Sequence, residues 1–126
     1  MAKIFEKLSN KVIGCAIEVH KHLGPGLLES VYQTCLEYEL KLNQINFKKE
    51  LTIPIRYKNV IIDNSYRIDL LVEDSLILEL KSVKNLENIY SAQLLTYMKI
   101  MNVKTGLLIN FNTTLLKHGI KRFVLE

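Results

Sequence analysis

Residues 67–81 read RIDLLVEDSLILELK, and this stretch carries the clearest fold signal in the chain. Two apolar runs flank a polar Glu-Asp-Ser triplet, which is the pattern of two antiparallel strands joined by a short loop. With the triplet as the loop, Val72 pairs with Leu76, and the register continues until Asp69 faces Glu79. The stretch therefore predicts a hairpin that sets two carboxylates opposite each other.

Side chains alternate between the two faces of this hairpin. One face is predicted to be apolar and to join the core, and it consists of Ile68, Leu70, Val72, Leu76, Leu78 and Leu80. The other face carries Arg67, Asp69, Leu71, Ile77, Glu79 and Lys81. Facing carboxylates, with Cβ atoms about 5 Å apart, destabilise a sheet unless another charge neutralises them. A divalent cation supplies that charge; the plainer interpretation is a solvated face on which Arg67 and Lys81 balance the two acids.

Two helices are predicted before the hairpin. The first covers residues 3–22, and its apolar side is formed by Ile4, Phe5, Leu8, Val12, Cys15, Ala16 and Val19. Pro25, between Gly24 and Gly26, cannot continue that helix and predicts a tight turn. The second helix runs from about residue 26 to 43, and its apolar side is formed by Leu28, Tyr32, Cys35, Leu36 and Leu40.

Strands and one more helix are predicted for the rest of the chain. Leu51, Ile53 and Ile55 alternate with polar residues, as in a strand, and Pro54 favours an edge position for it. The other expected elements are a turn at 58–59, strands at 60–72 and 76–83, a helix at about 86–101 with Asn85 as N-cap and Glu87 in its first turn, a strand at 105–110 and a last strand at 119–125. We therefore expect one α/β domain, residues 1–126, with the order ααβββαβ(β).

Composition agrees with a globular domain: 126 residues, 48% of them hydrophobic and 24% charged. No apolar run approaches the roughly 20 residues of a membrane helix, and residues 1–7 lack the apolar stretch of a signal peptide, so a cytoplasmic protein is expected. Cys15 and Cys35 are too few for a zinc site and are interpreted as buried apolar side chains. The net charge of +4 is compatible with a polyanionic partner without requiring one.

Two polar residues fall on the predicted apolar sides of helices. Glu29 lies inside the apolar arc of the second helix. Gln93 lies on the core side of the third helix, among Leu86, Ile89, Tyr90, Tyr97 and Ile100. Each has a plain explanation, because Glu29 can reach water at a helix rim and Gln93 can pair with Tyr97 four residues on. Taken with the acids and the lysine of the hairpin, they favour one inward-facing polar site.

Four motifs in the chain resemble those of a known family. Residues 26–32 read GLLESVY and match GxxExxY, the motif that names a family of small bacterial and archaeal proteins placed in the PD-(D/E)xK nuclease superfamily. Asp69 resembles the acid on the superfamily's second strand, and residues 79–81 match its ExK. Residues 93–97, QLLTY, resemble the QxxxY helix motif of the RecB-like branch. The resemblance runs from about residue 5 to 125, although Ile68 stands where the superfamily has its proline.

The resemblance implies a restriction-endonuclease-like core and a Mg²⁺- or Mn²⁺-dependent nuclease that hydrolyses nucleic-acid phosphodiester bonds. It implies that Asp69, Glu79 and the main-chain carbonyl of Leu80 hold the ion, with Glu29 binding directly or through water. Lys81 is then expected to orient the attacking water, to help deprotonate it and to stabilise charge on the phosphate. Three further residues are expected to position the substrate or brace the site, namely Gln93, Tyr97 and Tyr32.

Two other classes of function stay open on the residues alone. The chain could be a nuclease-fold module that binds nucleic acid or protein without catalysis, and a protein that takes up no metal would favour this class. It could also be a metal-dependent phosphoesterase for a small substrate, which a deep closed pocket would favour. An open basic groove would instead favour nucleic acid. The intact set of acids and lysine favours the nuclease.

Overall fold

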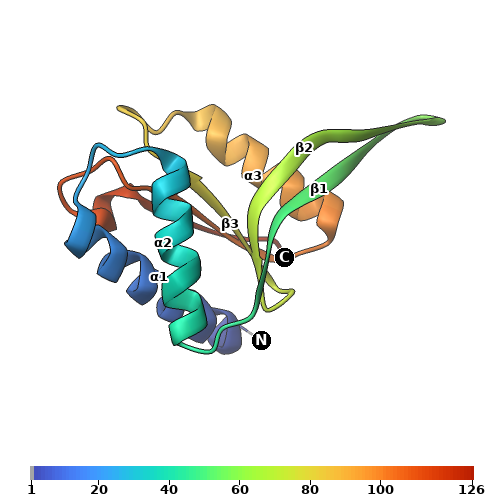
Figure 1. Cartoon of the computed structure of the whole chain (residues 1–126). Helices are drawn as coiled ribbons and strands as arrows, with labels where there is room; N and C mark the ends of the chain where they lie inside the picture. The colour runs from blue at the N-terminus through green and yellow to red at the C-terminus, as the bar shows by residue number, and fades with distance from the viewer. Residues whose placement is uncertain (1) are drawn as a thin grey trace.

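A mixed β-sheet with helices on both faces forms the centre of the molecule (Figure 1). The computed structural model describes the backbone of residues 2–126 and the side chains of residues 6–63 and 66–126. The elements in chain order are α1 (Ala2–Leu23), α2 (Glu29–Leu42), β1 (Phe47–Tyr57), β2 (Val60–Val72), β3 (Leu76–Lys81), α3 (Asn88–Met101), β4 (Thr105–Asn110), the short 3-10 helix η1 (Leu116–Gly119) and β5 (Ile120–Val124).

The strands follow one another across the sheet in the order β1-β2-β3-β4-β5. The first three form an antiparallel meander, β4 runs parallel to β3 after the α3 crossover, and β5 pairs antiparallel with β4. The predicted order ααβββαβ(β) is confirmed, with the last strand present. The edge position that Pro54 favoured for its strand is also confirmed. None of the helices described is long and apolar enough to cross a bilayer.

Each face of the sheet has its own apolar core. On one face, α1 and α2 cover Leu70, Val72 and Leu78 with side chains that include Val12, Val19, Tyr32, Leu36 and Leu40. On the other face, Leu94, Tyr97 and Met98 of α3 pack against Leu71 and Ile77. Burial on both faces explains why β3 is apolar almost throughout. The face that carries Leu71 and Ile77 is therefore buried under α3 rather than solvated.

The predicted apolar face of the hairpin is wrong at Ile68, which belongs to the α3 side. Lys49 pairs with Leu70 and Leu51 with Ile68, so Glu50 lies across from Asp69. Glu50 has a positive φ of 53°, a left-handed conformation that interrupts the regular alternation of a strand. At this point the side chains of both strands change sides: Leu70 lies on the α1–α2 side of the sheet, whereas Ile68 and Leu51 lie on the α3 side.

Three helix predictions also need correction. Leu28 is the N-cap residue of α2 and is 72% exposed, because α2 begins at Glu29 and not near residue 26. Helix α3 begins at Asn88 with Glu87 at its N-cap, so Asn85 lies outside it. Ile89 and Ile100, predicted to face the core, are exposed. The apolar side of α1 is confirmed where its side chains are described, whereas Ile4 and Phe5 lie outside the described side chains.

Candidate metal and catalytic site

Asp69 and Glu79 lie where β2 and β3 stop pairing. The antiparallel register runs from Val72–Leu76 to Leu70–Leu78 and ends one pair before the predicted Asp69–Glu79 pair. Beyond it the carboxylates replace the backbone ladder. The backbone N–H of Leu80 donates to Oδ2 of Asp69 at 2.7 Å, and the N–H of Asp69 donates to Oε1 of Glu79 at 3.3 Å. Each acid is thus held by the neighbouring strand through one of its two oxygens.

Burial and mutual repulsion raise the pKa of both acids. Glu79 is only 8% exposed, and desolvation, followed by the charge of Asp69, raises its pKa to about 8. Desolvation also raises the pKa of Asp69, against the lowering effect of the Leu80 N–H, and the charges of Glu29 and Glu50 add to the rise. Two carboxylates so placed cost free energy when both are ionised. The pair therefore attracts a proton or a cation.

Lys81 and two tyrosines surround the acid pair on the α3 side. The charge of Lys81 opposes the rise in pKa of both Asp69 and Glu79. Its Nζ lies 4.7 Å from the ring centre of Tyr90 in a cation–π contact. Burial raises the pKa of the Tyr97 hydroxyl, and the charge of Glu79 raises it further. The hairpin thus presents two acids and a lysine together, as predicted for the face opposite Leu70.

Glu29 lies at the edge of this group rather than in an apolar arc. It is the first residue of α2 and is exposed. Its charge nevertheless raises the pKa of both Asp69 and Glu79, so the carboxylate is electrostatically coupled to the pair. The exposure of Glu29 agrees with the rim position that was one of the two alternatives from sequence, and its direction toward the sheet stays a prediction.

Tyr32 fixes the turn that precedes Glu29. Its hydroxyl donates to the carbonyl of Gly24 at 2.5 Å and accepts from the backbone N–H of Leu27 at 3.1 Å. The turn needs Gly24 and Gly26, whose φ values of +70° and +98° disfavour other residues. The GxxExxY residues are therefore one structural unit, in which the tyrosine and the glycine set the position of the glutamate.

Further contacts tie this turn to the sheet. The Ser82 hydroxyl, just after β3, donates to the carbonyl of Leu27 at 2.6 Å. The ring of Tyr32 is fully buried and stacks on Phe111, with centroids 4.4 Å apart and an angle of 7° between the planes. The start of α2 is thereby anchored to the strand ends that carry the acids.

Comparison with known proteins establishes the family. The family model described as PD-(D/E)XK nuclease superfamily matches residues 6–123. The chain belongs to the PD-(D/E)XK nuclease superfamily. A crystal structure of the protein SSO0001 is similar, with a TM-score of 0.52 and 23% sequence identity over 75% of this chain and 47% of that one. The chain spans about half the length of that protein, and the likeness shows a shared fold alone. The family match and the order of helices and strands are consistent with a restriction-endonuclease-like fold. No curated protein matches the chain.

Gln93 departs from its predicted position in this superfamily member. It is exposed, and the buried side of α3 is formed instead by Leu94, Tyr97 and Met98. Helix α3 packs closely on Gly106 of β4, where an added Cβ would lie 2.7 Å from the Met98 sulfur. This close approach selects the side of the helix that faces the sheet, and it leaves Gln93 open to solvent.

Asn110 is a supporting residue that the sequence reasoning missed. It is buried at the end of β4, beside Lys81 in the parallel register. Its side-chain amide donates to the carbonyl of Val83 and its oxygen accepts from the N–H of Val83, both at 3.0 Å. The N–H of Phe111 also donates to the carbonyl of Lys81 at 2.9 Å. These bonds fix the chain on the C-terminal side of the catalytic lysine candidate. The sequence signal that could have identified Asn110 is its position as a polar residue at the end of the apolar run 105–110.

Divalent metals are generally used by PD-(D/E)XK nucleases, and the donor set here fits one. Within the described residues, no group of three His, Cys, Asp or Glu side chains converges, so Glu29 stands apart from the Asp69–Glu79 pair. Mg²⁺ needs only one or two carboxylates because it retains several waters. No described side-chain oxygen or nitrogen is both fully buried and unpartnered, so oxygens of the pair that make no hydrogen bond reach solvent.

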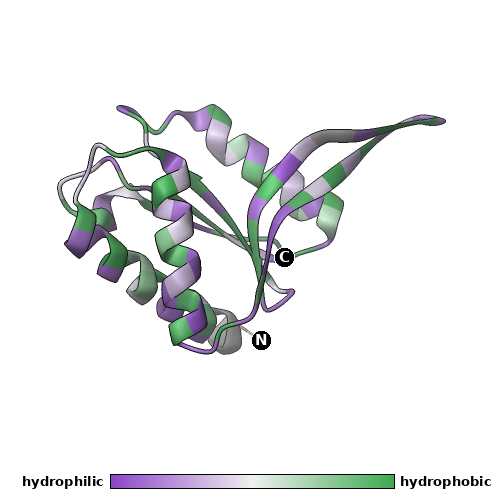
Figure 2. Cartoon of the chain, in the orientation of Figure 1, coloured by the Kyte–Doolittle hydropathy of each residue, from purple (hydrophilic) through white to green (hydrophobic). Residues whose placement is uncertain are grey.

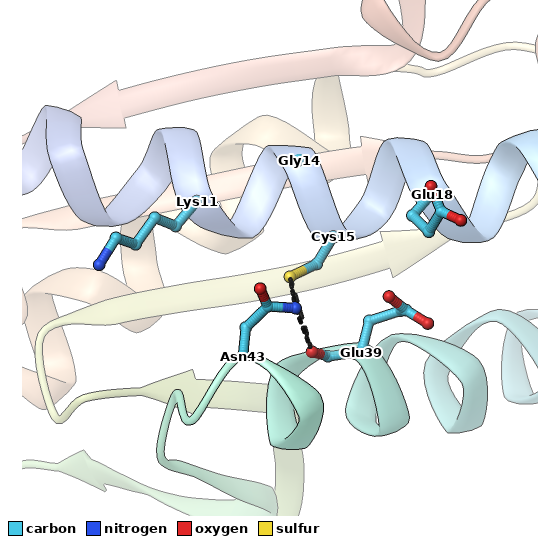
Figure 3. A pocket seen from close by; sticks show the side chains of 6 residues that line it. All are labelled: Lys11, Gly14, Cys15, Glu18, Glu39 and Asn43. Carbon is cyan, nitrogen blue, oxygen red and sulfur yellow. Dashed lines mark hydrogen bonds between the residues drawn. The ribbon is translucent and has the colours of Figure 1, made fainter.

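A separate cavity between α1 and α2 has no part in this arrangement (Figure 3). It has a volume of about 430 Å³ and is lined by Lys11, Gly14, Cys15, Glu18, Glu39 and Asn43. The Cys15 thiol donates to the carbonyl of Glu39, and the Asn43 amide donates to the sulfur (Figure 3). Burial raises the pKa of this thiol, which makes it a weak nucleophile. The predicted role of Cys15 as a buried apolar side chain agrees with these contacts.

Proposed function

We propose that this chain is a Mg²⁺- or Mn²⁺-dependent nuclease domain that hydrolyses phosphodiester bonds in nucleic acid. One observation carries the proposal: Asp69 and Glu79 meet at a break in the sheet with Lys81 beside them. Superfamily membership supports the same class of reaction. The GLLESVY and QLLTY motifs further support assignment to the GxxExxY family and to the RecB-like branch.

The carboxylates of Asp69 and Glu79 are the proposed metal ligands, together with the main-chain carbonyl of Leu80. Glu29 is proposed to act through water, because it is exposed at the start of α2 and stands apart from the pair. A bound divalent ion neutralises the two acids, lowers the pKa of water and stabilises negative charge on a phosphate. This neutralisation relieves the repulsion that raises the pKa of Glu79.

Lys81 is the proposed group for orienting the attacking water. Its ammonium lies close enough to both acids to lower their pKa, and the Tyr90 ring limits the positions of Nζ. From this place it can help to remove the proton of the water and can stabilise the charge that develops on the phosphate. The two hydrogen bonds between Asn110 and Val83 support this role because they fix the chain that follows Lys81.

Three other residues are proposed to support the reaction. Gln93 is exposed on α3, one turn before Tyr97, and is free to contact the substrate backbone. Tyr97 lies near Glu79 and braces the acid pair. Tyr32 positions Glu29 through the turn.

The test is cleavage of single-stranded and double-stranded DNA and RNA with purified protein. We expect slow cleavage that requires Mg²⁺ or Mn²⁺, stops with EDTA and is lost in Glu79→Gln. Absence of cleavage under all these conditions, with metal binding confirmed by calorimetry, would support a noncatalytic binding module instead.

A further inference from the structure

The β1–β2 hairpin extends past the rest of the sheet as a two-stranded ribbon (Figure 1). Strand β2 pairs with β3 only from Leu70 to Val72, so its earlier residues have β1 as their sole strand partner among the described elements. No helix covers the tip of the ribbon, where apolar and polar residues are mixed (Figure 2). An isolated two-stranded hairpin is only marginally stable in water. A partner that covers the ribbon would therefore stabilise it.

The ribbon carries an excess of positive charge. Residues 54–67 contain three cationic residues and one acid, which gives this segment a net charge of +2. The cations are Arg56, Lys58 and Arg67, and the acid is Asp63. All three cationic side chains are exposed. The ion pairs found within the described residues join other groups, so these three cations have no carboxylate partner there. Charge complementarity thus favours an acidic partner.

The two faces of the ribbon differ. Ile55 pairs with Ile62 and Tyr57 with Val60, so these side chains share the face that continues from the α3 side of the sheet. Arg56 pairs with Ile61 on the opposite face. A basic side chain beside an exposed apolar one suits a base edge and a phosphate, because arginine binds guanine or phosphate and aliphatic groups contact thymine methyls.

The base of the ribbon, where it joins the rest of the sheet, lies next to Asp69 on β2. Tyr66 and Arg67 come just before Asp69 on β2. The ring of Tyr66 lies 6.1 Å from that of Tyr97, whose hydroxyl is influenced by the charge of Glu79. The α3-side face of the ribbon therefore continues to the side of the sheet on which the acids lie.

We propose that the β1–β2 ribbon is a binding arm for double-stranded nucleic acid, with Arg56 and Lys58 contacting phosphates and base edges and Arg67, on the same face as Arg56, contacting a further phosphate. This inference rests on the proposed nuclease function and names its substrate class. A two-stranded ribbon fits the major groove of B-DNA, which is about 12 Å wide. Five residues of strand extend about 17 Å, roughly five base-pair steps. The arm accordingly reaches a few base pairs from the position of cutting.

A second copy of this chain fits the ribbon less well. Two ribbons meeting through the face of Arg56 would bring together two positive surfaces, and the repulsion would oppose association. Two ribbons meeting through the face of Ile55 and Tyr57 would leave Arg56 without an acidic partner. A duplex instead supplies phosphates for the cations and apolar base groups for Ile61. The two partners are nevertheless separable by experiment.

Duplex binding in EDTA tests the proposal, because EDTA blocks metal-dependent cleavage and binding is then scored alone. We compare wild type, the double variant Arg56→Ser/Lys58→Ser, and the control Lys117→Ser/Lys121→Ser, which removes equal charge from exposed positions at η1 and β5. The affinity of the ribbon variant for a short labelled duplex should fall by about tenfold or more. Its salt dependence should lose about 0.9 in slope for each phosphate contact removed. The control should stay within about twofold of wild type, and thermal midpoints should match.

Three results would overturn the proposal. One is a ribbon variant with the affinity and salt slope of the control. Another is tighter binding of wild type to the single strand than to the duplex. The third is a wild-type dimer in sedimentation that Val60→Ser/Ile62→Ser dissociates without weakening duplex binding, because the ribbon would then be a self-association surface. Duplex binding through the ribbon without any cleavage would contradict the nuclease function and leave the arm supported.

Discussion

The backbone N–H of Asp69 donates a hydrogen bond to the carboxylate of Glu79 across 3.3 Å. The Asp69 carboxylate in turn accepts a hydrogen bond from the N–H of Leu80 at 2.7 Å. Beyond the Leu70–Leu78 pair, side-chain carboxylates therefore accept from the backbone N–H groups in place of backbone carbonyls. Both acids are positioned by backbone groups of a neighbouring strand. Their charge and their hydrogen-bonding capacity can consequently be removed separately by substitution.

Asp69→Asn and Asp69→Ala should differ in stability without metal. The amide oxygen of asparagine can still accept from the Leu80 N–H, and the loss of charge relieves repulsion with Glu79, so Asp69→Asn should be at least as stable as wild type. Alanine leaves a backbone donor without its partner, which costs about 1–3 kcal/mol. Urea unfolding with EDTA measures both variants. A loss above about 2 kcal/mol for Asp69→Asn would show that the negative charge itself is structural.

Metal binding should depend on the same pair. We expect calorimetry to show Mn²⁺ uptake by wild type and at least a tenfold weaker affinity for Asp69→Asn, because one of the two carboxylate ligands is lost. Glu50→Gln is the matched control, since it removes a neighbouring exposed charge outside the proposed ligand set. Equal Mn²⁺ affinities for wild type and Asp69→Asn would refute this metal site.

Stability without metal should fall as the pH rises from about 4.5 to about 8. Burial raises the pKa of Glu79 from its ordinary 4.5 to about 8, so between these values the folded state holds a proton that the unfolded state has lost. The stabilisation is complete below pH 4.5 and is lost as the pH passes the folded value, at no more than about 1.4 kcal/mol per pH unit for one proton. Glu79→Gln should flatten the profile. A wild-type profile that rises with pH across this window would contradict the assignment.

The Tyr32 hydroxyl should matter for both stability and activity. Tyr32→Phe removes the bonds to Gly24 and Leu27, and we expect a loss of about 1–2 kcal/mol. Cleavage should fall further than Mn²⁺ affinity, because Glu29 is displaced while the acid pair is untouched. Tyr38→Phe, on the exposed side of the same helix, is the control. A Tyr32→Phe variant with wild-type stability and cleavage would show that the turn does not depend on this hydroxyl.

The sequence predicted the fold where periodicity and turn chemistry agree. The Glu-Asp-Ser loop set the register of β2 and β3 correctly through Leu70–Leu78, and the apolar run at 105–110 was a strand with those same bounds. The pattern failed at Ile68, because both strands change faces at the position of Glu50 and Asp69, where Glu50 has a positive φ that no sequence rule assigns to a glutamate.

The motifs predicted the clustering of Asp69, Glu79 and Lys81 better than the helical wheels predicted the positions of Glu29 and Gln93. The wheel assumed wrong helix limits, so it placed Glu29 inside a helix that it actually begins. It also placed Gln93 in the core, whereas the close approach of Met98 to Gly106 turns it to solvent. Such contacts depend on how α3 docks on β4. Asn110 was missed because its partner Val83 is 27 residues away in sequence, and the pairing of β3 with β4 brings the two together.

Cleavage by Lys81→Ala measures the central claim most directly. Lys104→Ala, an exposed lysine just before β4, serves as the matched control, and Mn²⁺ titration of both variants shows whether the metal site persists. The account predicts that Lys81→Ala binds Mn²⁺ but cleaves at least about a hundredfold more slowly than wild type, as for loss of a positioned proton-transfer group. Lys104→Ala should cleave at the wild-type rate. Undiminished cleavage by Lys81→Ala would contradict the account.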